Sequence, residues 1–156
     1  MIDWRDTLLG LHVAPGSLAL CLGAVAIVAE RRPPFRSITG CLFHWAVLAT
    51  AATAVGLVAF DPLELWWLAG LTGLTYGLAL VGYLAPRRRR RGWLRVNAHG
   101  QGGSLIALVT AVLVVSHDGT AAAAAWIVPT LIGVPLIERR VTRISAQTTT
   151  SPRRIR

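Results

Sequence analysis

Clusters of arginine alternate with long apolar stretches along this chain. Fifteen of the sixteen arginines fall within residues 31–36, 87–95 and 139–156, and the chain contains no lysine. Basic clusters next to apolar segments stay on the cytoplasmic side of a membrane, according to the positive-inside rule. The alternation is therefore typical of a polytopic membrane protein, and the clusters predict which loops face the cytoplasm.

The composition argues against an ordinary soluble domain. The chain has 156 residues, of which 54% are hydrophobic. This is more than the core of one soluble domain of ordinary composition can bury. A net charge of +9 would suggest nucleic acid as the partner of a soluble protein. Here the basic residues flank apolar segments, without the interleaved aromatic residues of a nucleic-acid surface. We therefore expect membrane lipid as a partner and no nucleic acid.

The start of the chain does not read as a secretory signal. Residues 1–6 carry Asp3, Asp6 and a single basic residue, Arg5, whereas a signal peptide begins with positive charges. We expect the first apolar segment to be retained. All basic residues other than histidine are arginine, and Ala, Gly and Pro are abundant, which suggests a GC-rich bacterial genome. Together with the apolar segments, this predicts a multi-pass protein of the bacterial cytoplasmic membrane.

Five apolar segments predict the architecture. A helix needs about 20 apolar residues to cross a bilayer, and the first four segments meet this length easily while the fifth is minimal. The sequence predicts an all-α bundle of five transmembrane helices in one domain, residues 1–144, followed by a disordered basic cytoplasmic tail, 145–156. The predicted spans are residues 8–29, 38–60, 63–84, 96–116 and 121–137.

Loop charges predict the orientation. Acidic loops at Asp61 and Asp118 alternate with the arginine clusters, so the N-terminus is expected outside and the C-terminus inside. Anionic headgroups could also bind these arginines, each contributing about 1 kcal/mol, but a role in topology is the simpler interpretation. The residues with this topology or lipid role are Arg31, Arg32, Arg36, Arg87, Arg88, Arg89, Arg90, Arg91 and Arg95.

Small residues predict helix-packing faces. Gly16 and Gly23 lie on one face of the first span, and Gly73 and Gly77 form a Gly-x-x-x-Gly pattern in the third. Small residues let the backbones of two membrane helices approach closely. We expect Gly73 and Gly77 to meet a helix of the same chain in preference to one of a second copy.

Four histidines are the main candidates for chemistry, because polar side chains inside a membrane are costly. Predicted depth pairs His44 with His99 near the inner face, and His12 with His117 near the outer face. His44 and His99 could bind haem b or a metal. Hydrogen-bonded packing histidines are the favoured interpretation.

The other polar intramembrane positions are less specific. Asn97, Gln101 and Ser104 share one face of the fourth span, with His99 adjacent. His12 shares the face of Gly16 and Gly23, so we expect it to point towards another helix. No catalytic triad, phosphate-binding loop, dinucleotide fingerprint or zinc-protease pattern occurs, and an enzyme is not favoured.

Several stretches resemble a family of uncharacterised small bacterial membrane proteins, the domain of unknown function number 2306 and its relatives. They are residues 11–20, 34–40, 99–116 and 126–137, which include His12 and His99. The resemblance implies an integral inner-membrane protein and no assigned activity. Phe35 stands where the family tends to have a histidine, so a family site that needed this histidine would be lost or moved here.

These observations predict a small integral membrane protein that acts as an accessory or assembly subunit, packing with itself or with a partner. One alternative is a haem- or metal-binding redox protein that uses His44 and His99. Another is a small oligomeric transporter, although the sequence has neither a buried ion pair nor matching broken helices.

Overall fold

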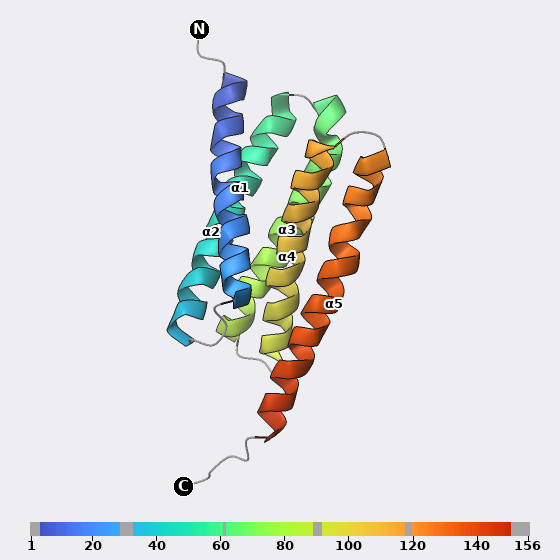
Figure 1. Cartoon of the computed structure of the whole chain (residues 1–156). Helices are drawn as coiled ribbons and strands as arrows, with labels where there is room; N and C mark the ends of the chain where they lie inside the picture. Colours follow the sequence, from blue (N-terminus) through green and yellow to red (C-terminus); the bar gives the residue numbers. More distant parts are fainter. Residues whose placement is uncertain (1–3, 29–32, 61, 89–91, 118–119, 151–156) are drawn as a thin grey trace.

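The protein is a bundle of five antiparallel helices (Figure 1). The computed structural model describes residues 4–28, 33–60, 62–88, 92–117 and 120–150, and all of these are helical except Gly92 and His117. The helices are α1 (Trp4–Val28), α2 (Pro33–Phe60), α3 (Pro62–Arg88), α4 (Trp93–Ser116) and α5 (Thr120–Thr150). The predicted all-α fold is therefore confirmed.

Four of the helices are long and apolar enough to cross a membrane. These stretches are Trp4–Ala26, Ile38–Phe60, Leu65–Arg88 and Trp93–Ser116, and each overlaps one predicted span. The described part of α5 is not among them. The fold is that of a membrane protein with four candidate spans, and a fifth span in α5 stays a prediction.

Most described arginine side chains gather at one end of the bundle, which we call the Arg-rich end. The last turns of α3, the start of α4 and the lower part of α5 meet there (Figure 1). Arg31, Arg32 and Arg89 to Arg91 lie outside the described residues, as does the side chain of Arg36. The described side chains at this end belong to Arg87, Arg88, Arg95, Arg139, Arg140 and Arg143.

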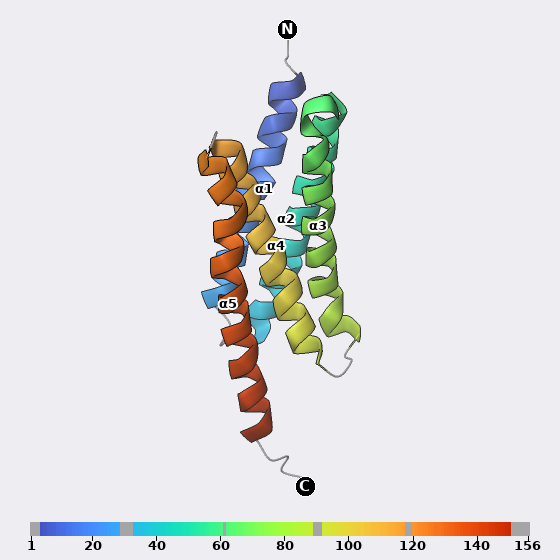
Figure 2. The ribbon, with the colours of Figure 1, turned by 90° about the vertical axis from the view of Figure 1, so that its right-hand side faces the viewer.

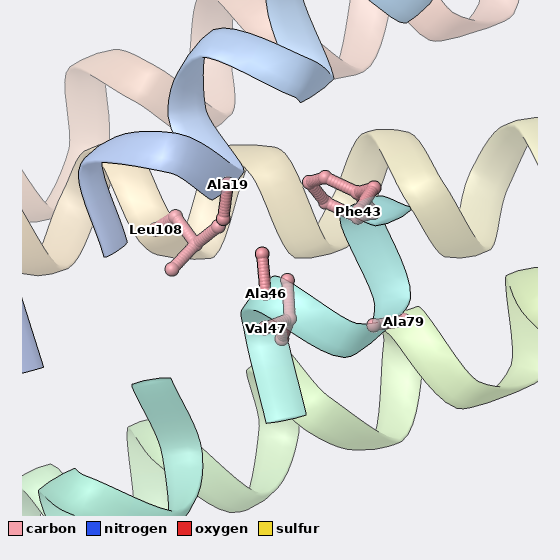
Figure 3. Packing of buried hydrophobic residues seen from close by; sticks show 6 residues of the cluster. All are labelled: Ala19, Phe43, Ala46, Val47, Ala79 and Leu108. Carbon is pink, nitrogen blue, oxygen red and sulfur yellow. The ribbon is translucent and has the colours of Figure 1, made fainter. Parts of the chain in front are cut away.

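The core is built from small side chains on four helices. Ala46 and Val47 of α2 face Ala19 of α1, Ala79 of α3 and Leu108 of α4, and Phe43 fills the space one turn away (Figure 3). Because alanine has only a methyl side chain, these helices can pack closely. The helix α5 adds no residue to this cluster and packs mainly against α4, at the edge of the bundle (Figure 2).

The helices α3 and α4 approach each other closely at Gly82 and Gly100. A methyl group added to Gly100 would lie 2.5 Å from the Gly82 nitrogen and 2.7 Å from the carbonyl oxygen of Leu78. The two backbones are therefore in direct contact, which only glycine permits. Neither glycine stands out in the sequence, because each belongs to a different helix and the contact joins the two.

The last helix is longer than its apolar segment. We expected residues 145–156 to be disordered, but α5 continues to Thr150. No glycine or proline lies between Pro135 and Pro152 to end the helix. The polar residues that follow the apolar segment therefore continue α5. Residues 151–156 lie outside the described part of the chain.

Candidate functional site

His44 lies between α2 and α3 in a cluster of aromatic rings. Its side chain stacks on Tyr83, with ring centroids 4.0 Å apart and planes 7° apart. Tyr76 and Trp45 lie farther away, with centroids at 5.8 Å and 5.7 Å. His44 is only 5% exposed, and its Nδ1 has no hydrogen-bond partner among the described residues. The ring therefore contributes by stacking, and one polar atom stays unsatisfied.

Arg87 extends this cluster towards the Arg-rich end. Its guanidinium carbon lies 3.6 Å from the centroid of the Tyr83 ring, and Nη1 donates a hydrogen bond of 3.0 Å to the Tyr83 carbonyl. A cation over an aromatic face is attracted by the electrons of the ring. The stack on Tyr83 thus links a buried histidine to an arginine at the end of α3.

His99 connects α4 to α5. Its Nδ1 lies 2.8 Å from the Arg95 carbonyl oxygen, and its Nε2 lies 2.9 Å from Oε1 of Glu138. Both ring nitrogens thus face acceptor oxygens, an arrangement that suits an imidazolium donating to each. His99 and Glu138 thus form an ion pair between α4 and α5.

The structure places the proposed haem or metal pair in different surroundings. His44 packs against α3, whereas His99 packs against α5, and no hydrogen bond or ring contact joins them within the described part of the chain. The described residues also hold no group of three metal-ligating side chains. The two imidazoles do not converge on one ligand position here, so a haem or metal would require new contacts for both. That site stays a prediction.

The polar residues of α4 face different helices. Asn97 donates a hydrogen bond of 2.7 Å from Nδ2 to the Gly82 carbonyl of α3. Gln101 lies over Gly40 of α2, where an added methyl group would be 2.9 Å from its Nε2. Ser104 is fully buried, and its hydroxyl has no partner among the described residues. These side chains line helix contacts and do not assemble into one polar site with His99.

The two outer histidines have separate roles. His12 of α1 faces α2, where its Nδ1 donates to the Thr50 carbonyl at 3.0 Å and lies 3.1 Å from Oγ1 of Thr53. His117 is exposed after the end of α4, and its Nδ1 donates to the Leu113 carbonyl at 2.9 Å. His12 thus ties α1 to α2, whereas His117 caps its own helix.

The glycines expected to pack helices divide into two groups. A methyl group on Gly16 would meet Thr50 at 3.5 Å, and one on Gly23 would meet Leu105 at 2.6 Å, so both face another helix. Gly73 and Gly77 have no atom of the described bundle within 4 Å of such a methyl group. The expected intrachain contact at Gly73 and Gly77 is therefore wrong, because the face of α3 that carries them points away from α2 and α4.

An open cavity lies near the Arg-rich end, where α1 and α5 flank α4. Its volume is about 20 Å³, which is enough for about one water molecule. Small residues of α1 and α4 line it, and an arginine of α5 borders it. We call it the α1–α5 groove, and its lining residues are Gly23, Ala26, Phe43, Gln101, Gly102, Leu105 and Arg140.

Comparison with known proteins adds no relative. No family model, no curated protein and no solved structure matches the chain. The resemblance to the domain of unknown function therefore stays a prediction, and the functional argument depends on the geometry alone.

Proposed function

We propose that the protein is a non-enzymatic assembly subunit of a bacterial cytoplasmic membrane, and that it associates with a second copy through α3. The contact surface, which we call the α3 face, repeats every three or four residues along one side of the helix. Its members are Trp66, Gly70, Gly73, Leu74, Gly77 and Val81.

The observation that carries this proposal is the open space beside three glycines of one helix face. Gly70, Gly73 and Gly77 each have no described neighbour within 4 Å of an added methyl group. Trp66 and Leu74 on the same face are 70% and 56% exposed. In lipid, helices associate by close backbone packing, and a Gly-x-x-x-Gly pattern allows it.

Self-association also fits the lack of a reactive cluster among the described residues. His12, His44 and His99 are engaged in stacking or in hydrogen bonds between helices, and polar residues of α4 line helix contacts. The described side chains thus supply packed helices, and the α3 face adds glycines with open space beside them. The haem- or metal-binding protein and the small transporter remain alternatives with no such supporting contact.

The experiment measures self-association in liposomes by energy transfer between labelled copies. Gly77→Leu should weaken it about tenfold, because the larger side chain keeps two α3 helices apart. Gly10→Leu is the matched control, since Gly10 of α1 also has open space around it. Equal association of both variants and the unmodified protein would rule out the α3 face as the interface.

We also propose five spans, with the N-terminus outside and the C-terminus in the cytoplasm. Support comes from the Arg-rich end, which would face the cytoplasm by the positive-inside rule. The same rule would place α5 across the membrane, because Arg139, Arg140 and Arg143 lie in the second half of α5, which extends to the Arg-rich end (Figure 1).

A further inference from the structure

The helix α5 lies at the edge of the bundle, where it is held mainly by α4 (Figure 2). Glycines accommodate two isoleucines between these helices. Ile106 of α4 lies against Gly133, and Ile137 of α5 lies 2.7 Å from the position of a methyl group added to Gly102. Pro135 separates the two contacts, and because proline has no backbone N–H, α5 lacks one helix hydrogen bond there. The part of α5 that follows Pro135 is therefore less firmly tied to the part before it.

A polar link joins this second part of α5 to α4. The Glu138 Oε1 atom is 2.9 Å from His99 Nε2, and His99 Nδ1 is 2.8 Å from the carbonyl oxygen of Arg95. From all the helices that pack against α4, the described charged groups that act on the ring are the Glu138 carboxylate and the Arg95 guanidinium. The side chains of His99 and Glu138 are 43% and 59% exposed, so the link can exchange protons with its surroundings.

The protonation state of His99 decides how many of its contacts are hydrogen bonds. An imidazolium has two N–H groups and donates to both oxygens, whereas a neutral imidazole has one and turns a lone pair towards the other oxygen. When the ring loses its proton, one contact and the charge attraction are therefore lost. At low pH the attraction is lost as well, because Glu138 becomes protonated. The complete link exists only between these two titrations.

We propose that the pair of His99 and Glu138 makes the attachment of the second half of α5 sensitive to pH. In the range in which histidine titrates, roughly pH 5 to 8, loss of the ring proton moves the segment after Pro135 away from α4. Ile137 and the buried Val141 keep this segment on the bundle, so the change is a shift and not a release. The inference does not depend on self-association through the α3 face, so the two proposals can fail separately.

Two spin labels on the full chain in liposomes measure the separation of α4 and α5 at the Arg-rich end. Val96→Cys and Thr142→Cys place the labels at exposed positions without changing charge, in a background with Cys21→Ser and Cys41→Ser. Raising the pH from about 6 to about 8 should increase the ratio of longer to shorter distances about threefold, as expected for a partly exposed ion pair. Identical distances at both pH values would overturn the proposal.

The matched variant is Glu138→Gln. Its amide accepts a hydrogen bond from a protonated ring and donates one to a neutral ring, so the contact persists at both pH values. The distances should not depend on pH in Glu138→Gln or in His99→Gln, which both keep the other histidines. An unchanged pH dependence in either variant contradicts the proposal, so one of them suffices if the other does not fold.

A second pair of labels tests whether the shift is local. Val115→Cys and Ala123→Cys lie at exposed positions at the other end of α4 and α5. Their separation should be the same at both pH values, because the ion pair lies beyond Pro135. An equal shift at both ends would also overturn the proposal, since the whole helix would then move and not the segment that carries Glu138.

Discussion

Gly100 of α4 lies against Gly82 of α3 with no side chain between the two backbones. Beside this contact, Asn97 donates to the Gly82 carbonyl, so a hydrogen bond and a backbone contact hold α3 to α4 at the same point. The backbone contact and the hydrogen bond both require the close approach of α3 and α4, which glycine at residues 82 and 100 allows.

Gly100→Ala should therefore destabilise the bundle. The new methyl group would meet backbone atoms at 2.5 to 2.7 Å, and backbone cannot move aside as a flexible side chain does. We expect a loss of about 1–3 kcal/mol in the free energy of unfolding, measured by denaturation in mixed detergent micelles. Gly10→Ala is the control, because nothing lies within 4 Å there. Equal stability of the two variants would show that the helices separate at this point.

The ion pair of His99 and Glu138 should contribute modestly to the attachment of α5. The two side chains are 43% and 59% exposed, and exposed pairs contribute about 0–1 kcal/mol. A double-mutant cycle with His99→Ala and Glu138→Ala should give a coupling energy in this range that falls as salt is raised. A coupling that does not change with salt would mean that the contact is not ionic.

The topology can be tested by labelling a single cysteine. The two native cysteines are free, so Cys21→Ser and Cys41→Ser provide a background without thiols. Asp118→Cys, between α4 and α5 in the sequence, should then react with a membrane-impermeant reagent added outside intact cells. Labelling from the cytoplasmic side alone would contradict the proposed orientation, and with it the assignment of the Arg-rich end to the cytoplasm.

The sequence predicted the helices well and their partners poorly. Apolar length and flanking charge are properties of one segment, so they located four candidate spans and the Arg-rich end. Which face of a helix meets which neighbour depends on all the helices at once. Gly73 and Gly77 have the better-known pattern but face outwards, whereas Gly82 and Gly100 form the tight contact from two different helices.

The same limit applies to the histidines. The depth of a residue in the membrane follows from its position along the span and the rise of the helix. This depth predicted that His44 and His99 lie at a similar distance from the inner membrane face. Direction around the helix axis was not fixed, because each histidine could face any neighbour. In the structure one ring faces Tyr83 and the other faces Glu138, so equal depth did not bring them together.

The last prediction concerns His44, whose ring is buried but whose Nδ1 has no partner among the described residues. If its role is to stack on Tyr83, His44→Phe should be as stable as the unmodified protein or slightly more so, because it keeps the ring and removes an unsatisfied polar atom. His44→Ala should lose roughly 2 kcal/mol or more, because it leaves a cavity beside Tyr83. Unfolding in mixed micelles measures both.

An absorption spectrum of the purified protein separates this structural role from a cofactor site. A stacking histidine predicts a colourless protein, with the same spectrum for His44→Phe. A Soret band that disappears in His44→Phe and in His99→Ala would instead support the haem alternative, because phenylalanine keeps the stack but cannot ligate iron. Phenylalanine at residue 44 is the decisive substitution, since its benzene ring can still stack on Tyr83 but has no nitrogen atom to ligate iron.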